Sequence, residues 1–477
     1  MNHRILVLLV CTFLSLKNLH AQSPAEKLNR AVFNQIEYFF NINQPDSIYN
    51  LASESFKQNI ERQSFINFLS NLYTYGKMSG VTPATFSNNT AGYNVLIGDQ
   101  KFSIHLAVDS TKKFNYFLVK PNHIVDPRIT PIQAKVNKQN SLDEFIDSIA
   151  RAYLTHPSTQ SLAIGVLNNG QVNTFFYGQL DPAEKLSIPN EHTLYEVGSL
   201  TKLFTSVLLA HLVEEGSLSL EDSIAKFLPD SVKTNPFIRK ITFKQLANHT
   251  SGLPRLPSNL DKVAKFSAAN PYANYTRKDL FHFLKDFNGQ NEPGENYEYS
   301  NLGFGLLGEL ISIITNKSFA QNIKDLITEP LGMHNTVEKI NPKNQVLAKP
   351  HNAEGRQVPA WDFLALAGAG SLKSSVHDLL RFAQFQFKLP ETTLEKAMML
   401  TREFTFYLPP NTDIGLGWHM NMLEDVVQYW HNGGTGGSSS FLGIVPDKKS
   451  AIVVLSNSAI SVDEISSKIL EKIAVSK

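Results

Sequence analysis

The spacing of hydrophobic residues changes from helical to strand-like within the first quarter of the chain. Apolar residues first recur every three or four positions, at Leu28, Ala31, Val32, Ile36 and Phe39. Two further helical stretches follow near residues 47–60 and 64–73. The period then becomes two, because apolar and polar residues alternate over 101–109 and again over 114–118. Helices followed by strands predict a small α+β domain over residues 24–120.

A proline-punctuated stretch over residues 121–140 follows this domain. Pro121, Pro127 and Pro131 interrupt any regular element there, and polar residues dominate. We therefore predict a linker at 121–140 and a second domain over 141–477.

The second domain has strand patterns at both ends and helices between them. Residues 162–166 and 172–177 flank Asn169-Gly170, a dipeptide typical of a tight hairpin turn. Strand patterns return at 415–420, 426–430, 439–445 and 451–455, and residues 463–474 predict a closing helix. This order predicts one antiparallel sheet assembled from both ends of the domain, flanked by helices and carrying a helical insertion.

The first residues have the form of a secretory signal peptide. A short basic lead, Asn2-His3-Arg4, precedes the apolar run 5–16, and Leu19-His20-Ala21 ends in a small residue. The run is too short to span a bilayer. We predict a signal peptide at 1–21, cleavage near Ala21, and a periplasmic or secreted mature protein.

Composition excludes several classes of partner. The 44 Lys and Arg residues nearly balance the 43 Asp and Glu residues, and no dense basic run occurs, so we predict no nucleic-acid binding. After residue 16, no apolar run is long enough to predict a membrane-spanning helix. The 14 histidines include no H-E-x-x-H pattern, so we predict no metal and no cofactor. The oligomeric state stays open.

Ser199-Leu200-Thr201-Lys202 is the first candidate for chemistry. Residues three apart share a helical face, so a helix beginning here would hold the serine hydroxyl beside the lysine amine. An amine beside a serine can activate it as an acyl-transfer nucleophile. The same S-x-x-K spacing occurs at Ser110 and Ser223, but neither precedes a long apolar helix.

Two downstream motifs complete the pattern. Y-x-N occurs at Tyr272 and at Tyr299, and only Tyr299 lies between a Pro-Gly turn and a glycine-containing apolar helix, so we select Tyr299 and expect Tyr272 at the surface or the pocket rim. The third motif is Trp430-His431-Asn432-Gly433-Gly434, where glycines would allow the backbone to approach a substrate closely.

These three motifs, in this order, resemble the serine β-lactamase-related hydrolases, in particular the branch with class C β-lactamases, D-alanyl-D-alanine carboxypeptidases and esterases. The resemblance extends to residues 247–254, 329–333, 367–372 and 378–379. It implies a β-lactamase/transpeptidase-like α+β fold for the second domain. The order of elements in the first domain resembles small cystatin-like or nuclear-transport-factor-like domains. In residues 247–254, His249 is expected to fix a loop by hydrogen bonding.

The resemblance also implies roles for individual residues. Ser199 would attack a carbonyl carbon and form an acyl-enzyme. Lys202 would lower the pKa of Tyr299, which would serve as the base, either alone or sharing a proton with Lys202. Asn301 would bind Lys202 and the substrate amide, and the backbone N–H groups of Ser199 and Gly434 would form the oxyanion hole.

The chain departs from the family pattern at one position. His431-Asn432-Gly433 stands where penicillinases often carry Lys-Thr-Gly. Histidine is mostly neutral at pH 7, so His431 is expected to favour uncharged substrates and to bind carboxylates better once protonated near pH 6. We predict a hydrolase acting on a small-molecule or peptide acyl substrate, an ester or a D-amino-acid amide. The alternative is a weakly catalytic penicillin-binding sensor or scaffold protein.

Overall fold

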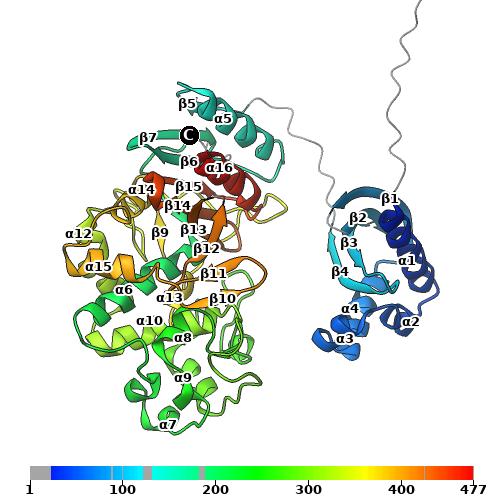
Figure 1. Cartoon of the computed structure of the whole chain (residues 1–477), viewed down its shortest axis with the longest axis horizontal. Helices are drawn as coiled ribbons and strands as arrows, with labels where there is room; N and C mark the ends of the chain where they lie inside the picture. Colours follow the sequence, from blue (N-terminus) through cyan, green and yellow to red (C-terminus); the bar gives the residue numbers. More distant parts are fainter. Residues whose placement is uncertain are drawn as a thin grey trace, which may run out of the picture. The chain divides into compact units, whose positions relative to one another are not determined.

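The computed structural model describes residues 23–87, 90–98, 100–121, 132–181, 188–423 and 425–475. The chain separates into two compact units, residues 1–125 and 126–477 (Figure 1). The predicted signal peptide and residues 122–131 of the predicted linker lie outside the described residues. Among the described helices, none combines the length and the apolar character needed to cross a bilayer.

The first unit consists of helices followed by a four-stranded antiparallel sheet in the order β1-β2-β3-β4. The helices are α1 (Pro24–Asn41), α2 (Pro45–Asn50), α3 (Glu54–Asn59) and α4 (Arg62–Tyr73). The strands are β1 (Met78–Ser87), β2 (Thr90–Ile97), β3 (Gln100–Val108) and β4 (Phe114–Pro121). The alternation predicted for β3 is confirmed, since Phe102, Ile104 and Leu106 are buried in the core of this unit.

One helix prediction in this unit is wrong. Residues 47–60 do not form a single helix, because the chain leaves the helical path between α2 and α3. There the Phe114 N–H donates to the Leu51 carbonyl (3.0 Å) and the Ser53 N–H donates to the Phe114 carbonyl (2.8 Å). Pairing with the start of β4 therefore replaces the helical hydrogen bonds.

The second unit is built on a nine-stranded antiparallel sheet with the order β10-β11-β12-β13-β14-β15-β6-β7-β5 (Figure 1). The strands from the start of the unit are β5 (Ala134–Val136), β6 (Ser161–Asn168) and β7 (Gln171–Gly178). Those from its end are β10 (Phe406–Leu408), β11 (Thr412–Ile414), β12 (His419–Leu423), β13 (Val426–Gly434), β14 (Ser439–Val445) and β15 (Ser450–Ser456).

The sheet closes by pairing β6 with β15, as predicted from the strand patterns at both ends. The register joins Leu162 to Ser456 and Leu167 to Ala451. The predicted Asn169-Gly170 turn between β6 and β7 is confirmed, because both residues have positive φ (50° and 79°). The expected strand at 415–420 begins later, at His419. The N–H groups of residues 415–417 bond to loops and helix ends instead of a neighbouring strand.

Helices cover both faces of this sheet. On one face, α5 (Ser141–Tyr153) and α16 (Asp463–Val475) pack on alternate residues of β6, β14 and β15, including Ile164, Phe441 and Val454. On the other face lies α14 (Val376–Phe385), which contacts β6 and β15. Helix α6 (Thr201–Glu214) belongs to the same buried apolar cluster as α14. Because both faces are covered, β14 and β15 are apolar along most of their length and fully buried.

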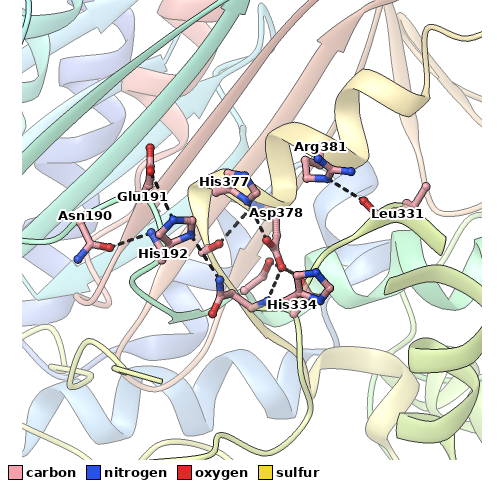
Figure 2. A network of polar contacts seen from close by, with 12 residues as sticks. Asn190, Glu191, His192, Leu331, His334, His377, Asp378 and Arg381 are labelled. Carbon is pink, nitrogen blue, oxygen red and sulfur yellow. Dashed lines mark hydrogen bonds and ion pairs between the residues drawn. The ribbon is translucent and has the colours of Figure 1, made fainter. Parts of the chain in front are cut away.

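A buried carboxylate anchors the segments behind the sheet. Asp378 on α14 is 1% exposed and accepts from the Asn335 N–H (2.7 Å) and the Thr336 hydroxyl (2.9 Å). Figure 2 shows Asp378 beside His377, with the Asn190–His192 loop facing them. The His377 N–H donates to the Glu191 carbonyl (3.0 Å), so α14 holds the loop that leads toward Ser199.

Candidate active site

Ser199 lies in a short 3-10 turn, Gly198–Leu200, that runs directly into α6. Gly198 adopts a φ of +48°, and a Cβ atom there would lie 2.8 Å from the Gly434 nitrogen. The glycine therefore lets the Ser199 turn pack against the end of β13. Helix α6 is buried around its whole circumference over most of its length, which holds the turn rigidly.

Lys202 is fully buried and reaches three oxygen atoms. Its Nζ lies 3.1 Å from Ser199 Oγ, 2.8 Å from Asn301 Oδ1 and 2.8 Å from the Ala369 carbonyl oxygen. Burial, and then the positive charge of Arg255, lowers the pKa of Lys202 well below its usual value. In its neutral form, this amine can accept the Ser199 proton.

Tyr299 immediately precedes the N-cap of α10 (Asn301–Thr315) and hydrogen-bonds to the Ser199 side chain. Lys202 Nζ lies 4.8 Å from the centre of its ring. We expected Lys202 to lower the pKa of Tyr299, and that expectation is wrong. Burial raises the pKa of Tyr299, and the hydrogen bond with Ser199 opposes the rise only in part. The phenol is therefore protonated, and the amine carries the low pKa.

His249 fixes the Tyr299 loop, as expected. Its Nδ1 accepts from the Ser300 N–H (3.0 Å), and its ring lies 4.3 Å from the Tyr299 ring centre. The Ser300 hydroxyl in turn accepts from the Gly303 N–H (2.8 Å), which caps α10. Burial lowers the pKa of His249 well below its usual value, so it stays neutral.

Tyr272 lies deeper than the sequence indicated. It is 7% exposed, stacks on Phe363 with ring centres 4.6 Å apart, and packs edge-on against Trp361. Its hydroxyl hydrogen-bonds to Asn301. Tyr272 is therefore part of the pocket wall, and Asn301 connects it to Lys202.

The last residues of β13 run past Ser199. Pairing between β12 and β13 stops at Trp430, so residues 431–434 leave one strand edge open. A Cβ atom on Gly433 would lie 2.2 Å from the Val197 oxygen and 3.0 Å from the Ser199 nitrogen, whereas one on Gly434 would lie 3.8 Å from its nearest neighbour. The backbone can approach Ser199 this closely only because Gly433 has no side chain.

His431 is placed differently from our expectation. Its side chain is completely buried and lies outside the pocket lining, with its ring centre 6.2 Å from that of Tyr299. Burial, followed by the charges of His419 and Lys202, lowers the pKa of His431 well below its usual value. Protonation of His431 near pH 6 is therefore not expected. The prediction that this protonation would improve carboxylate binding is wrong.

Sequence reasoning missed Glu196. This buried residue accepts from the Trp361 N–H (2.6 Å), the Thr435 hydroxyl (2.9 Å) and the Ser438 hydroxyl (3.4 Å). Burial raises the pKa of its carboxyl. Glu196 thus ties the turn after β13 to the strand that precedes Ser199. Its place three residues before the serine was the only signal in the sequence.

Ser199, Tyr299, Asn301 and Gly433 line a pocket of about 510 Å³. Its walls are mostly hydroxyl, amide and aromatic groups, among them Tyr272, Trp361, Trp430 and Ser438. Within the described ranges, no group of three or more His, Cys, Asp or Glu side chains is arranged to hold a metal ion.

Comparison with protein families and with known proteins shows which sequences this chain is similar to. The family model described as Beta-lactamase matches residues 146–475. Protein flp of Staphylococcus aureus (strain MW2) is 29% identical over 333 residues, which cover 67% of this chain and 64% of that protein. The D-alanyl-D-alanine-carboxypeptidase/endopeptidase AmpH of Escherichia coli (strain K12) is 27% identical over 340 residues, covering 67% of this chain and 86% of that protein. The chain thus spans less than two thirds of the length of flp.

Solved structures share the fold of the second unit. A class C β-lactamase superposes with a TM-score of 0.63 at 22% identity, covering 70% of this chain and 96% of that one. A β-lactamase/D-alanine carboxypeptidase from Pseudomonas syringae gives the same TM-score and identity, covering 70% and 99%. The predicted β-lactamase-like α+β fold is confirmed.

Proposed function

Because the chain belongs to the β-lactamase family, we propose that it is a serine hydrolase that forms an acyl-enzyme on an ester or a D-amino-acid amide. The observation that carries the proposal is the 3.1 Å separation of Lys202 Nζ from Oγ of Ser199, a residue that lines the pocket. A serine paired with a neutral amine is an activated acyl-transfer nucleophile.

Acylation begins when Ser199 Oγ attacks the substrate carbonyl carbon and its proton passes to Lys202 Nζ. The lowered pKa of Lys202, caused by burial and by Arg255, supports this direction of transfer. The negative charge on the carbonyl oxygen is stabilised by the N–H groups of Ser199 and Gly434, and losing one such donor typically costs ~10²–10³ in rate.

The leaving group then departs with a proton from the hydroxyl of Tyr299, which is re-protonated by Lys202. The raised pKa of Tyr299, caused by burial, supports its role as the acid in this step. In deacylation, water attacks the ester carbonyl and its proton passes to the Lys202–Tyr299 pair. Ser199 regains its proton as the product acid leaves.

Asn301 and Gly433 have positioning roles. Asn301 accepts from Lys202 and contacts Tyr272, which leaves its amide oriented toward the pocket. Gly433 keeps the β13 edge against the Ser199 nitrogen. His431, which is buried, supports Tyr299 from behind and does not bind the substrate. The reaction occurs outside the cytoplasm if the leader at residues 1–21 directs export.

The test compares Ser199→Ala with Ser110→Ala in the full chain. Ser110 shares the S-x-x-K spacing but lies in an exposed turn of the first unit. Ser199→Ala should abolish both covalent labelling by a fluorophosphonate probe and hydrolysis of short-chain nitrophenyl esters, while Ser110→Ala should retain both. Full activity in Ser199→Ala would disprove the assignment.

The same experiment separates the enzyme from a sensor or scaffold. An enzyme releases the label and regenerates free Ser199, whereas a sensor remains labelled. Parallel assays with D-alanyl peptides and a chromogenic cephalosporin would identify the acyl class that is turned over.

A further inference from the structure

The pocket beside Ser199 contains one carboxylate and one guanidinium among the described residues that line it. The carboxylate is Asp463 and the guanidinium is Arg255. Neither side chain forms an ion pair within the described part of the chain. Two opposite charges therefore face one pocket without neutralising each other, which is the arrangement of a site that binds charged groups.

Asp463 is fixed beside the strand that passes the nucleophile. It is the first residue of α16, and its Oδ2 accepts from Asn432 Nδ2 at 2.9 Å. Asn432 lies two positions before Gly434 on the open edge of β13. The other carboxylate oxygen, Oδ1, accepts no hydrogen bond from the described residues and is available to a ligand.

Among the described residues that line this end of the pocket, no lysine or arginine balances the charge of Asp463. His431, the neighbour of Asn432, is buried and neutral. The Arg255 guanidinium lies 5.1 Å from the Tyr299 ring centre, against a different group of the site. A substrate carboxylate lying against Asn432 would therefore meet a like charge, and an ammonium group would meet an opposite one.

We propose that Asp463 is a specificity-determining residue that selects acyl substrates with a primary ammonium group on the part that lies against Asn432. The proposal rests on the proposed hydrolase function, because it assumes that the substrate spans the pocket from Ser199 to Asp463. Substrates that are neutral at that position are accepted less well, and substrates with a carboxylate there are rejected.

The experiment uses the full chain and three matched nitrophenyl esters whose acyl chains end in an ammonium, a methyl or a carboxylate group. The variant is Asp463→Asn, which keeps an oxygen that can accept from Asn432. The matched control is Glu464→Gln, one residue further on the same helix, where the carboxylate is exposed and pairs with Lys468 instead.

We expect wild type to prefer the ammonium ester over the methyl ester in kcat/KM, and Asp463→Asn to reduce that preference about tenfold, through KM, as expected for a charge-assisted hydrogen bond. Glu464→Gln should keep the wild-type preference. An equal ammonium-to-methyl ratio in wild type and Asp463→Asn would overturn the proposal.

A binding measurement keeps this result separate from the hydrolase assignment. Matched non-hydrolysable amides with ammonium and methyl ends are titrated calorimetrically into Ser199→Ala, with and without Asp463→Asn. Tighter binding of the ammonium amide that depends on Asp463 supports the proposal even if no ester is hydrolysed. Equal affinity for both amides overturns it even if hydrolysis is efficient.

Discussion

The hydroxyls of Tyr299 and Tyr272 both lie close to the Ser199–Lys202–Asn301 cluster, but they contact different residues of it. Tyr299 hydrogen-bonds to Ser199, whereas Tyr272 hydrogen-bonds to Asn301. Only the first hydroxyl can transfer a proton to the reacting atoms. We therefore expect Tyr299→Phe to lower kcat by at least ~10², the usual scale for a lost acid or base.

Tyr272→Phe is the matched control, because it removes the hydroxyl of the other tyrosine that lines the same pocket. Its kcat should stay within a few-fold of wild type. The measurement is steady-state hydrolysis of one neutral nitrophenyl ester by both variants. A larger loss in Tyr272→Phe than in Tyr299→Phe would reverse the choice between the two Y-x-N motifs.

Arg255 is expected to set the pH range of acylation through Lys202. The amine must be neutral to accept the Ser199 proton, and its pKa is lowered by burial and by the Arg255 charge. Arg255→Gln removes the second cause, so the pKa of Lys202 rises and the amine is protonated over a wider range. The acidic limb of the acylation rate, measured with a neutral ester, should move to higher pH.

The control for this shift is Arg239→Gln, an exposed arginine that does not perturb Lys202. Its pH profile should overlay that of wild type. An unmoved acidic limb in Arg255→Gln would mean that Lys202 is not the group whose deprotonation permits acylation.

The residues recognised from the sequence are those whose chemistry depends on local spacing. Ser199 and Lys202 are one helical turn apart, so the S-x-x-K pattern was enough to bring them together. Glu196 and the buried setting of His431 depend on packing between distant segments. Single-sequence spacing carries no information about such burial, which also explains why the pKa values of His431 and Tyr299 were misjudged.

At the scale of single elements, β13 gives a sharp contrast between adjacent glycines. A Cβ atom on Gly433 would lie 2.2 Å from the Val197 oxygen, while one on Gly434 has room. Gly433→Ala should therefore push β13 away from Ser199, lowering kcat/KM by at least ~10² if the oxyanion hole is disrupted. Gly434→Ala keeps its backbone N–H and should retain activity within a few-fold.

Circular dichroism and thermal unfolding of both variants would show whether each is folded. Folded Gly433→Ala protein with wild-type acylation would contradict the proposed geometry at the end of β13.

Helices and strands with a clear hydrophobic period could be predicted from the sequence. The breaks and ends between them were harder to predict. The alternation in β3 and the apolar runs of β14 and β15 matched the structure, because burial of one or both faces dictates those patterns. The break between α2 and α3 comes from backbone pairing with Phe114, more than 50 positions away in the sequence. Helical spacing alone cannot indicate such a contact.

At the scale of the whole molecule, each unit encloses its own buried apolar clusters. The core of the first unit contains residues up to Phe114, and both cores of the second begin after residue 131. We propose that the first unit is an accessory domain, and we expect deletion of residues 24–120 to leave hydrolysis of a small activated ester within a few-fold. The measurement is kcat/KM of the purified truncated protein. A folded truncation without activity would show that the first unit completes the pocket.

The pairing of β6 with β15 has a consequence for the chain while it is being synthesised. Leu162 and Ser456 must meet to close the sheet, and Ser199, Lys202, Tyr299 and Gly434 all lie in the chain between them. Contacts so distant in sequence form slowly, after the local helices. A chain still emerging from the ribosome or a translocation channel therefore lacks the β13 backbone beside its serine. It is expected to remain chemically inert until nearly all of its length has been delivered.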